Sequence, residues 1–325
     1  MAYKFPMKVS IIIPTYNVEA YIVECLESVA RQTYQGALEC LIVDDCGTDN
    51  SISKAEDFIH AYLGDIDFRI LHHHHNRGLS AARNTGVEAA TGDYVYFLDS
   101  DDSIIPEAIE SMVNIVQNNP QIEMVQGGIL NMSWQAVDDF TMKGLPEYTD
   151  NVEWIAKNML FNLPVSSWNR LLKRDFLLNE RIIFHEGIIH EDVPYNFLLA
   201  MKCRSVGFVR KNTYLFRPQR EGSITNTPQE KRALRSRLII MHDCIDAFRF
   251  HSFESETIQN IALCALWKKW QIYMTIHSHE ILAIYSSEIS DVSKLMCRIT
   301  PWPTKALAVI QSLLPLRYRH FIKIK

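Results

Sequence analysis

The sequence predicts an α/β fold in which a mainly parallel sheet is flanked by helices and followed by a helical C-terminal extension. Short β-branched or aliphatic runs alternate with amphipathic helical segments over the first hundred residues, an order typical of parallel sheets. Beyond about residue 222 the strand signals fade, and residues 231–287 show only helical periodicity. A chain of 325 residues, of which 47% are hydrophobic, is long enough for one large domain or two smaller ones.

The first predicted strand is the β-branched run Val9–Ile13, which Pro14 should end. A helix is predicted next because apolar residues recur on one face at helical spacing from Ile22 to Val29. Asp49 or Ser51 is expected to cap the second helix. In chain order, strands are expected at residues 9–13, 40–43, 68–71, 94–98 and 124–126, and helices at 22–29, 52–62, 79–90, 104–117, 154–161 and 193–201.

Polar clusters follow three of the predicted strands. They are Pro14–Asn17, Asp44–Asp45 and Asp99–Asp101. Parallel α/β sheets bind ligands outside the carboxyl ends of their strands, so these clusters are predicted to meet at one edge of the sheet.

Asp99-Ser100-Asp101 is the most informative of these clusters. Two carboxylates at alternate positions just past a buried strand can share one divalent cation and present it to the phosphates of a ligand. Hard oxygen ligands suit Mg²⁺ or Mn²⁺. The alternative is an ordinary acidic triplet in a surface loop.

Bulk composition narrows the class of protein. A formal net charge of −5 argues against general nucleic-acid binding. Seven cysteines without any CxxC pair suggest neither a disulfide framework nor a zinc site, so a cytoplasmic location is expected. Neither a signal peptide nor a run of about 20 apolar residues that would span a bilayer is recognisable.

The tail Pro301–Lys325 differs from the rest of the chain. It holds five Lys or Arg residues and no acidic residue, and it mixes apolar with basic positions. One interpretation is a helix in peripheral contact with the inner face of the cell membrane. The other is a closing helix packed on the domain with a solvated basic end.

The chain resembles the family 2 glycosyltransferases, which have the GT-A fold with a Rossmann-like sheet. Four motifs in family order carry the resemblance across roughly residues 7–110, and they are Val9–Asn17, Val43–Asp49, Asn76–Gly86 and Gly92–Asp102. Three later segments are similar to enzymes that build bacterial surface polysaccharides, namely Trp168–Lys173, His190–Val193 and Phe216–Thr225.

The resemblance implies a domain at residues 7–222, with a nucleotide-binding half (7–102) and an acceptor half (103–222). A helical region with a basic amphipathic tail would follow at 223–325. It also implies a nucleotide-sugar donor, usually a UDP-sugar, a divalent cation (Mn²⁺ or Mg²⁺), and inversion at the anomeric carbon.

Carried onto this sequence, the family pattern has Pro14 and Tyr16 flank the nucleobase and Asp45 accept a hydrogen bond from uracil. Asp44 is implied as a group that contacts ribose or orders the backbone. The alternatives are that Tyr16 only covers the edge of the sheet, and that Asp44 or Asp45 caps the following helix.

The same pattern has Asp101 as the principal metal ligand and Asp99 in contact with ribose or metal, with Ser100 between them at the donor site. Arg83 would reach the nucleotide or the diphosphate, and its alternative is an ordinary surface ion pair. Asp102 is expected only to cap the turn before Pro106.

Glu191-Asp192 matches the Glu-Asp pair that supplies the catalytic base in this family. Asp192 would take the proton of the acceptor hydroxyl, and Glu191 would orient it or bind the acceptor. Because Asp192 precedes Val193-Pro194, helix capping is the alternative.

Arg217, with Arg220 and Ser223, is expected to close over the diphosphate, since Arg matches phosphate geometry. A solvated loop is the alternative. Trp168 would stack on a sugar or lie in the core. The run His72–His75 is predicted to be a polar strand end rather than a metal site, because its side chains alternate between faces.

The leading hypothesis is therefore a metal-dependent, inverting glycosyltransferase of the hexosyltransferase type, acting on a glycan or lipid-linked acceptor. The alternatives are a sugar nucleotidyltransferase and a non-catalytic sugar-nucleotide-binding or membrane scaffold protein. The second half of the chain carries no readable code for the sugar, the acceptor or the linkage.

Overall fold

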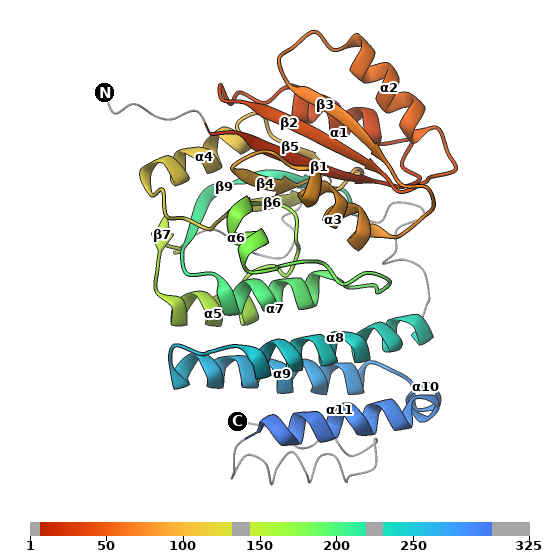
Figure 1. The fold of residues 1–325 in the computed structure, drawn as a ribbon, viewed down its shortest axis with the longest axis vertical. Coiled ribbons are helices and arrows are strands. Elements are labelled where there is room, and N and C mark those ends of the chain that lie inside the picture. The colour runs from red at the N-terminus through yellow and green to blue at the C-terminus, as the bar shows by residue number, and fades with distance from the viewer. Residues whose placement is uncertain (1–6, 132–143, 219–229, 301–325) are drawn as a thin grey trace.

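The computed structural model describes residues 7–131, 144–218 and 230–300 (Figure 1). The strands are β1 (Val9–Thr15), β2 (Leu38–Asp44), β3 (Asp67–His72), β4 (Tyr94–Phe97), β5 (Ser103–Ile104), β6 (Met124–Asn131), β7 (Tyr148–Thr149), β8 (Arg170–Lys173) and β9 (Val206–Phe216). The helices are α1 (Ile22–Ala30), α2 (Ser51–Ala61), α3 (Leu79–Ala89), α4 (Ala108–Asn118), α5 (Val152–Phe161), α6 (Arg174–Asn179), α7 (Asp192–Lys202), α8 (Glu230–Phe250), α9 (Glu256–Thr275), α10 (His279–Ile284) and α11 (Ser286–Ile299).

Within the described residues the strands form one mixed sheet in the order β3-β2-β1-β4-β8-β6-β9-β5, with β7 paired to β9. The first four strands are parallel, as the alternation of strands and helices predicts. The strands of the second half are mixed, because β8 runs antiparallel to both β4 and β6, whereas β6 and β9 are parallel. The sheet therefore joins a parallel half to a mixed half between β4 and β8.

Successive residues of a strand point to opposite faces of the sheet, so alternate residues pack into two hydrophobic layers. Val95 and Phe97 of β4 face the layer that contains α3, α5 and α7, whereas Tyr94 and Tyr96 face the layer that contains α1 and α4. Figure 1 shows these helices on opposite sides of the sheet. Burial on both faces explains why the strands read as continuous apolar runs.

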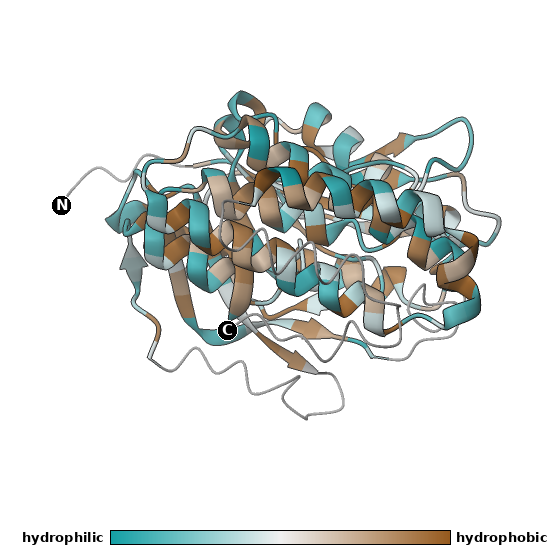
Figure 2. Ribbon diagram, turned by 90° about the horizontal axis from the view of Figure 1, so that it is seen from below, coloured by the Kyte–Doolittle hydropathy of each residue, from teal (hydrophilic) through white to brown (hydrophobic). Residues whose placement is uncertain are grey.

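The C-terminal helices form a further layer below α5 and α7 (Figure 1). One continuous hydrophobic cluster contains Ile12 of β1, Leu266 of α9 and Val292 of α11, so these helices share the core of the sheet. Figure 2 shows hydrophobic and hydrophilic segments alternating along them. None of the described helices is long and apolar enough to cross a membrane. The proposed boundary at residue 222 and the tail 301–325 lie outside the described residues.

Several element boundaries differ from the prediction, and two of the differences involve a proline. Pro14 does not end the first strand, which continues to Thr15. The Ile12 carbonyl accepts a hydrogen bond from the Leu98 backbone, so this side of β1 faces β4. Pro14 lies two residues further on, and its nitrogen points to the same side, where β4 has already ended. The strand can therefore continue through Pro14, because no hydrogen bond is lost there. Ile104 lies in β5 rather than at the start of a helix, and α4 begins after Pro106.

Candidate active site

The parallel strands bring the predicted polar clusters to one edge of the sheet. Thr15, at the end of β1, lies beside Asp44, at the end of β2, and Asp44 lies beside His72 of β3. β4 ends next to Ile12 of β1, so the loop that starts at Asp99 leaves from the same edge. The structure thus brings the three clusters together at the predicted place.

Arg83 of α3 is the centre of the site. Its guanidinium lies 2.8 Å from Asp99 Oδ1, 2.8 Å from Glu191 Oε1 and 3.4 Å from Asp192 Oδ1. The Arg83 side chain is only 1% exposed, so it is not a surface ion pair. Burial alone would lower the pKa of Arg83, but the three carboxylates raise it above its ordinary value. One buried cation therefore joins the loop after β4 to the start of α7.

The local sequence explains how α3 can place this arginine. Gly86 faces β1, and a Cβ at this position would lie 2.3 Å from Ile12 Cγ2, so glycine lets the helix approach the sheet. Gly78 precedes the helix with a φ of 90°, which favours glycine. The Arg83 guanidinium also lies over the ring of Phe184, 5.2 Å from its centroid.

Glu191 and Asp192 differ in their access to solvent. The Glu191 side chain is 9% exposed, whereas that of Asp192 is 28% exposed. Burial, followed by the charge of Asp192, raises the pKa of Glu191, and Arg83 opposes part of that rise. Glu191 occupies the N-cap position of α7, and its side chain makes no capping hydrogen bond. Asp192 is the first residue of the helix, so the N-cap alternative for Asp192 does not describe the structure.

The loop after β4 is held by β9, which the sequence did not reveal as a strand. Tyr214 Oη accepts a hydrogen bond of 3.2 Å from the Asp99 backbone and donates one of 2.7 Å to Asp102 Oδ2. The Arg217 backbone donates to Asp102 Oδ1 at 2.7 Å. Burial, together with the charges of Asp101 and Asp99, raises the pKa of Asp102. Asp102 therefore anchors the loop rather than only capping a turn.

The donor set for a cation is small. Among the described residues there is no group of three or more His, Cys, Asp or Glu side chains that would hold a metal ion. Asp99, with a side chain that is 24% exposed, and Asp101 supply carboxylate oxygens from one short loop. Mg²⁺ is usually bound through one or two carboxylates together with substrate phosphates and water. The residues present therefore fit a cation that binds together with a diphosphate.

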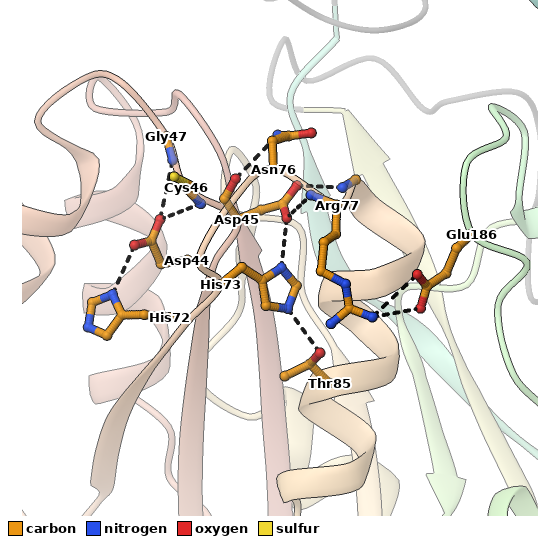
Figure 3. A network of polar contacts seen from close by, with 11 residues as sticks. Asp44, Asp45, Cys46, Gly47, His72, His73, Asn76, Arg77, Thr85 and Glu186 are labelled. Atoms are coloured by element: carbon orange, nitrogen blue, oxygen red, sulfur yellow. Dashed lines mark hydrogen bonds and ion pairs between the residues drawn. The ribbon is translucent and has the colours of Figure 1, made fainter.

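Asp44 and Asp45 hold backbone segments on either side of the β2 end (Figure 3). Asp44 Oδ1 accepts from the backbone of Cys46 and of Gly47, and Oδ2 lies 2.9 Å from His72 Nδ1. Asp45 is buried and accepts from the backbone of Gly78 at 2.7 Å, ahead of α3. Neither carboxylate caps the following helix, α2, whose N-cap residue is Asn50.

The remaining predicted residues surround these groups. Pro14 is buried in β1 and Tyr16 is exposed at the edge of the sheet. Ser100 is buried in the loop after β4. Arg217 contacts the Asp101 carbonyl at 3.1 Å and Glu24 at 2.6 Å.

Trp168 stacks on Tyr214 with ring centroids 4.3 Å apart, which places it in an aromatic cluster. Arg220 and Ser223 lie outside the described residues. The site also contains residues that the sequence reasoning missed, Tyr214 and His73 above all. A tyrosine in an unrecognised strand and one histidine within a run of four gave no distinguishing signal.

The sequence of this chain is similar to those of known proteins. A sequence model of Glycosyl transferase family 2 matches residues 10–157. The chain is 30% identical over 231 residues to Glycosyltransferase GlyG of Streptococcus pneumoniae, covering 67% of this chain and 73% of GlyG. It is 32% identical over 250 residues to Glycosyltransferase GlyA of the same species, covering 74% of this chain and 33% of GlyA. The chain thus spans about a third of the length of GlyA.

Solved structures share the fold. S. aureus TarS 1–349 in complex with UDP-GlcNAc superimposes with a TM-score of 0.73 at 18% identity, covering 97% of this chain and 88% of TarS 1–349. Mannosyltransferase PcManGT from Pyrobaculum calidifontis, in complex with GDP-Man and Mn²⁺, superimposes with a TM-score of 0.56 at 18% identity. The match covers 95% of this chain and 88% of PcManGT. The sheet, its flanking helices and the C-terminal helices have the GT-A architecture of TarS. The match to the family model and the similarity to GlyG over 73% of its length together show that the chain belongs to glycosyl transferase family 2.

Proposed function

We propose that the protein is an inverting glycosyltransferase that moves a sugar from a UDP-sugar to a hydroxyl of a glycan or lipid-linked acceptor in the synthesis of a bacterial surface polysaccharide. The observation that carries the proposal is the contact of Arg83 with both Asp99 and the Glu191-Asp192 pair. It joins the groups proposed for the donor to those proposed for the acceptor at one edge of the sheet.

The donor nucleotide would lie across the ends of β1, β2 and β4. Tyr16 is exposed beside the buried Pro14, and an exposed aromatic ring can stack on a nucleobase. Asp45 would accept a hydrogen bond from uracil, and Asp44 orders the loop of Cys46 and Gly47 beside it. The UDP-GlcNAc bound to TarS, which shares the fold, supports a uridine nucleotide.

Asp99 and Asp101 would hold Mn²⁺ or Mg²⁺ together with the diphosphate of the donor. The bound cation would stabilise the negative charge that develops on the departing diphosphate. Ser100 keeps the two carboxylates at alternate positions. Arg217 is held beside this loop by Glu24, an exposed partner that the diphosphate would replace.

Asp192 is the proposed catalytic base, because it is the more exposed carboxylate of the pair. Arg83 lies 3.4 Å from Asp192 Oδ1 and holds the carboxylate in place, and a carboxylate can accept a proton from the acceptor hydroxyl. Glu191, which is buried against Arg83, would orient the pair. Since Arg83 is itself buried, we propose that it acts on the donor through Asp99 rather than by direct contact with phosphate.

The test is a comparison of binding with turnover. Heat protection by UDP-, GDP- and dTDP-sugars with Mn²⁺ should single out the donor, since a ligand that binds the folded state raises its stability. Asp192→Asn should then abolish transfer and donor hydrolysis while UDP still binds. Asp175→Asn is the matched control, because Asp175 is an exposed aspartate in the first turn of α6.

Two outcomes would contradict the proposal. Full activity of Asp192→Asn would remove Asp192 from the chemistry. Binding of UDP without turnover of any donor or acceptor would favour the non-catalytic scaffold instead.

A further inference from the structure

His73 is the buried member of the run His72–His75. Its side chain is 4% exposed, whereas that of His72 is 56% exposed, and His74 and His75 are also exposed. The His73 ring lies between β3 and α3 with both nitrogens in contact (Figure 3). Nδ1 is 2.7 Å from Asp45 Oδ1, and Nε2 is 2.9 Å from Thr85 Oγ1.

The partners of the ring define its hydrogen-bonding state. An ionised carboxylate can only accept, so Nδ1 of His73 donates to Asp45. In the neutral ring Nε2 then accepts, and the Thr85 hydroxyl donates to it. The contacts Thr85–His73–Asp45 therefore join α3, the end of β3 and the end of β2.

The Asp45 carboxylate is almost completely occupied. Oδ1 accepts from His73 and from the Arg77 backbone at 2.8 Å, and Oδ2 accepts from the Gly78 backbone at 2.7 Å. A carboxylate offers about four lone-pair positions. Among contacts with the described residues three are used, which leaves one position on Oδ2 for a further N–H donor.

We propose that His73 is a positioning residue for the donor nucleobase. It holds Asp45 in the one rotamer that keeps Arg77 and Gly78 bonded and presents the remaining Oδ2 position to a pyrimidine N–H. His73 itself neither touches the nucleotide nor transfers a proton. The inference rests on the proposed function, because it names how the donor site recognises its base.

The test uses two substitutions, each of which preserves the hydrogen bond made by one of the two ring nitrogens. The amide nitrogen of Asn takes the place of Nδ1, so His73→Asn keeps a donor for Asp45 and loses Thr85. The amide of Gln takes the place of Nε2, so His73→Gln keeps a partner for Thr85 and loses Asp45. His74→Gln, at the exposed neighbour, is the matched control.

The measurements are the Kd of UDP by titration calorimetry, the KM of the UDP-sugar and kcat. His73→Gln should raise the Kd of UDP and the KM about tenfold, because a bond to a charged group is lost, and should leave kcat within about threefold. His73→Asn should stay within about threefold of wild type in all three quantities. Thr85→Val removes only the hydroxyl partner of Nε2 and should also stay within about threefold of wild type, because Nδ1 still donates to Asp45.

A purely structural role for the ring predicts a different result. His73→Asn and His73→Gln would then lower the Tm alike while both retained the wild-type Kd of UDP, and this outcome would overturn the inference. If His73→Gln does not fold, an about tenfold higher Kd of UDP in His73→Asn, which keeps the donor to Asp45, overturns it equally. A wild-type protein that transfers sugar but binds no uridine nucleotide refutes this inference and leaves glycosyl transfer intact.

Discussion

Asn84 and Phe184, one hundred residues apart, exchange two hydrogen bonds of 2.9 Å between a side-chain amide and the backbone. Asn84 lies next to Arg83 on α3, so the two residues bind the segment before α7 from neighbouring positions. Helix α3 therefore contacts both parts of the proposed site: it follows the loop that Asp45 anchors, and it holds the Glu191-Asp192 pair.

Asn84→Ala should remove both bonds and leave the partly buried Phe184 backbone N–H without a partner. We expect a loss of about 1–3 kcal/mol in the free energy of unfolding, measured by urea denaturation, together with a lower kcat. Glu186→Ala is the contrast, because its ion pair with Arg77 is exposed and should contribute less than about 1 kcal/mol. Equal losses in the two variants would contradict a special role for Asn84.

Arg83→Met should destabilise the protein strongly, because it leaves Asp99, Glu191 and Asp192 close together without their cation. Removing one partner of a buried ion pair costs about 3–5 kcal/mol, and we expect a loss of this size in urea denaturation at pH 7. Arg83→Lys should recover only part of it, since one ammonium cannot reproduce the planar fork. A variant Arg83→Met as stable as wild type would mean that the three carboxylates do not depend on Arg83.

Glu39 of β2 predicts how stability depends on pH. Burial alone would raise its pKa, but hydrogen bonds from Ser10, the Thr91 backbone and Lys8 lower it to about 2. The unfolded state therefore binds a proton at higher pH than the folded state does. The stabilisation from Glu39 is complete above about pH 5 and is lost as the pH falls toward 2.

Substituting Glu39 should flatten this profile. Denaturation of Glu39→Gln at a series of pH values should show a lower stability at pH 7 and a shallower loss between pH 5 and pH 2 than wild type. Glu27→Gln, which removes an exposed pair with Arg31, should leave the acid profile as it is. An unchanged slope in Glu39→Gln would mean that other carboxylates dominate acid unfolding.

Removing divalent cations with EDTA should abolish transfer, and Mn²⁺ should restore it, if Asp99 and Asp101 bind the metal with the diphosphate. Asp101→Asn should lower kcat about a hundredfold at saturating UDP-sugar. The exposed Asp65 provides the control, and Asp65→Asn should retain wild-type activity. Transfer that persists in EDTA would show that the two carboxylates act without a cation.

Apart from the two-residue strands β5 and β7, the strands and helices of the first half could be predicted from the sequence, because each is a contiguous pattern longer than a turn. β9 could not, since Arg210, Lys211 and Asn212 interrupt its apolar residues in the middle of the strand. β8 is only four residues long and contains Arg170, which is buried although arginine usually marks a surface. Both strands are stabilised by neighbours distant in sequence.

The candidate site shows the same division. The edge where the clusters meet follows from parallel strand order, so Asp44 and Asp99 could be placed from the sequence. Arg83 contacts Glu191, and Asn84 contacts Phe184. Each of these partners lies about a hundred residues away, and no local pattern links them. His73 could not be separated from its neighbours because identical residues differ only in which one faces α3.

Tyr214 gives the site an order of assembly. Its hydroxyl completes the loop of Asp99 and Asp102, yet it is translated 112 residues after Asp102. A nascent chain that has left the ribosome as far as residue 157 carries the motifs of the proposed donor half but lacks β9, the strand that anchors the loop after β4. We therefore expect the newly made protein to gain nucleotide affinity only after β9 has docked, and truncated products of translation to be inert toward the cell's pool of activated sugars.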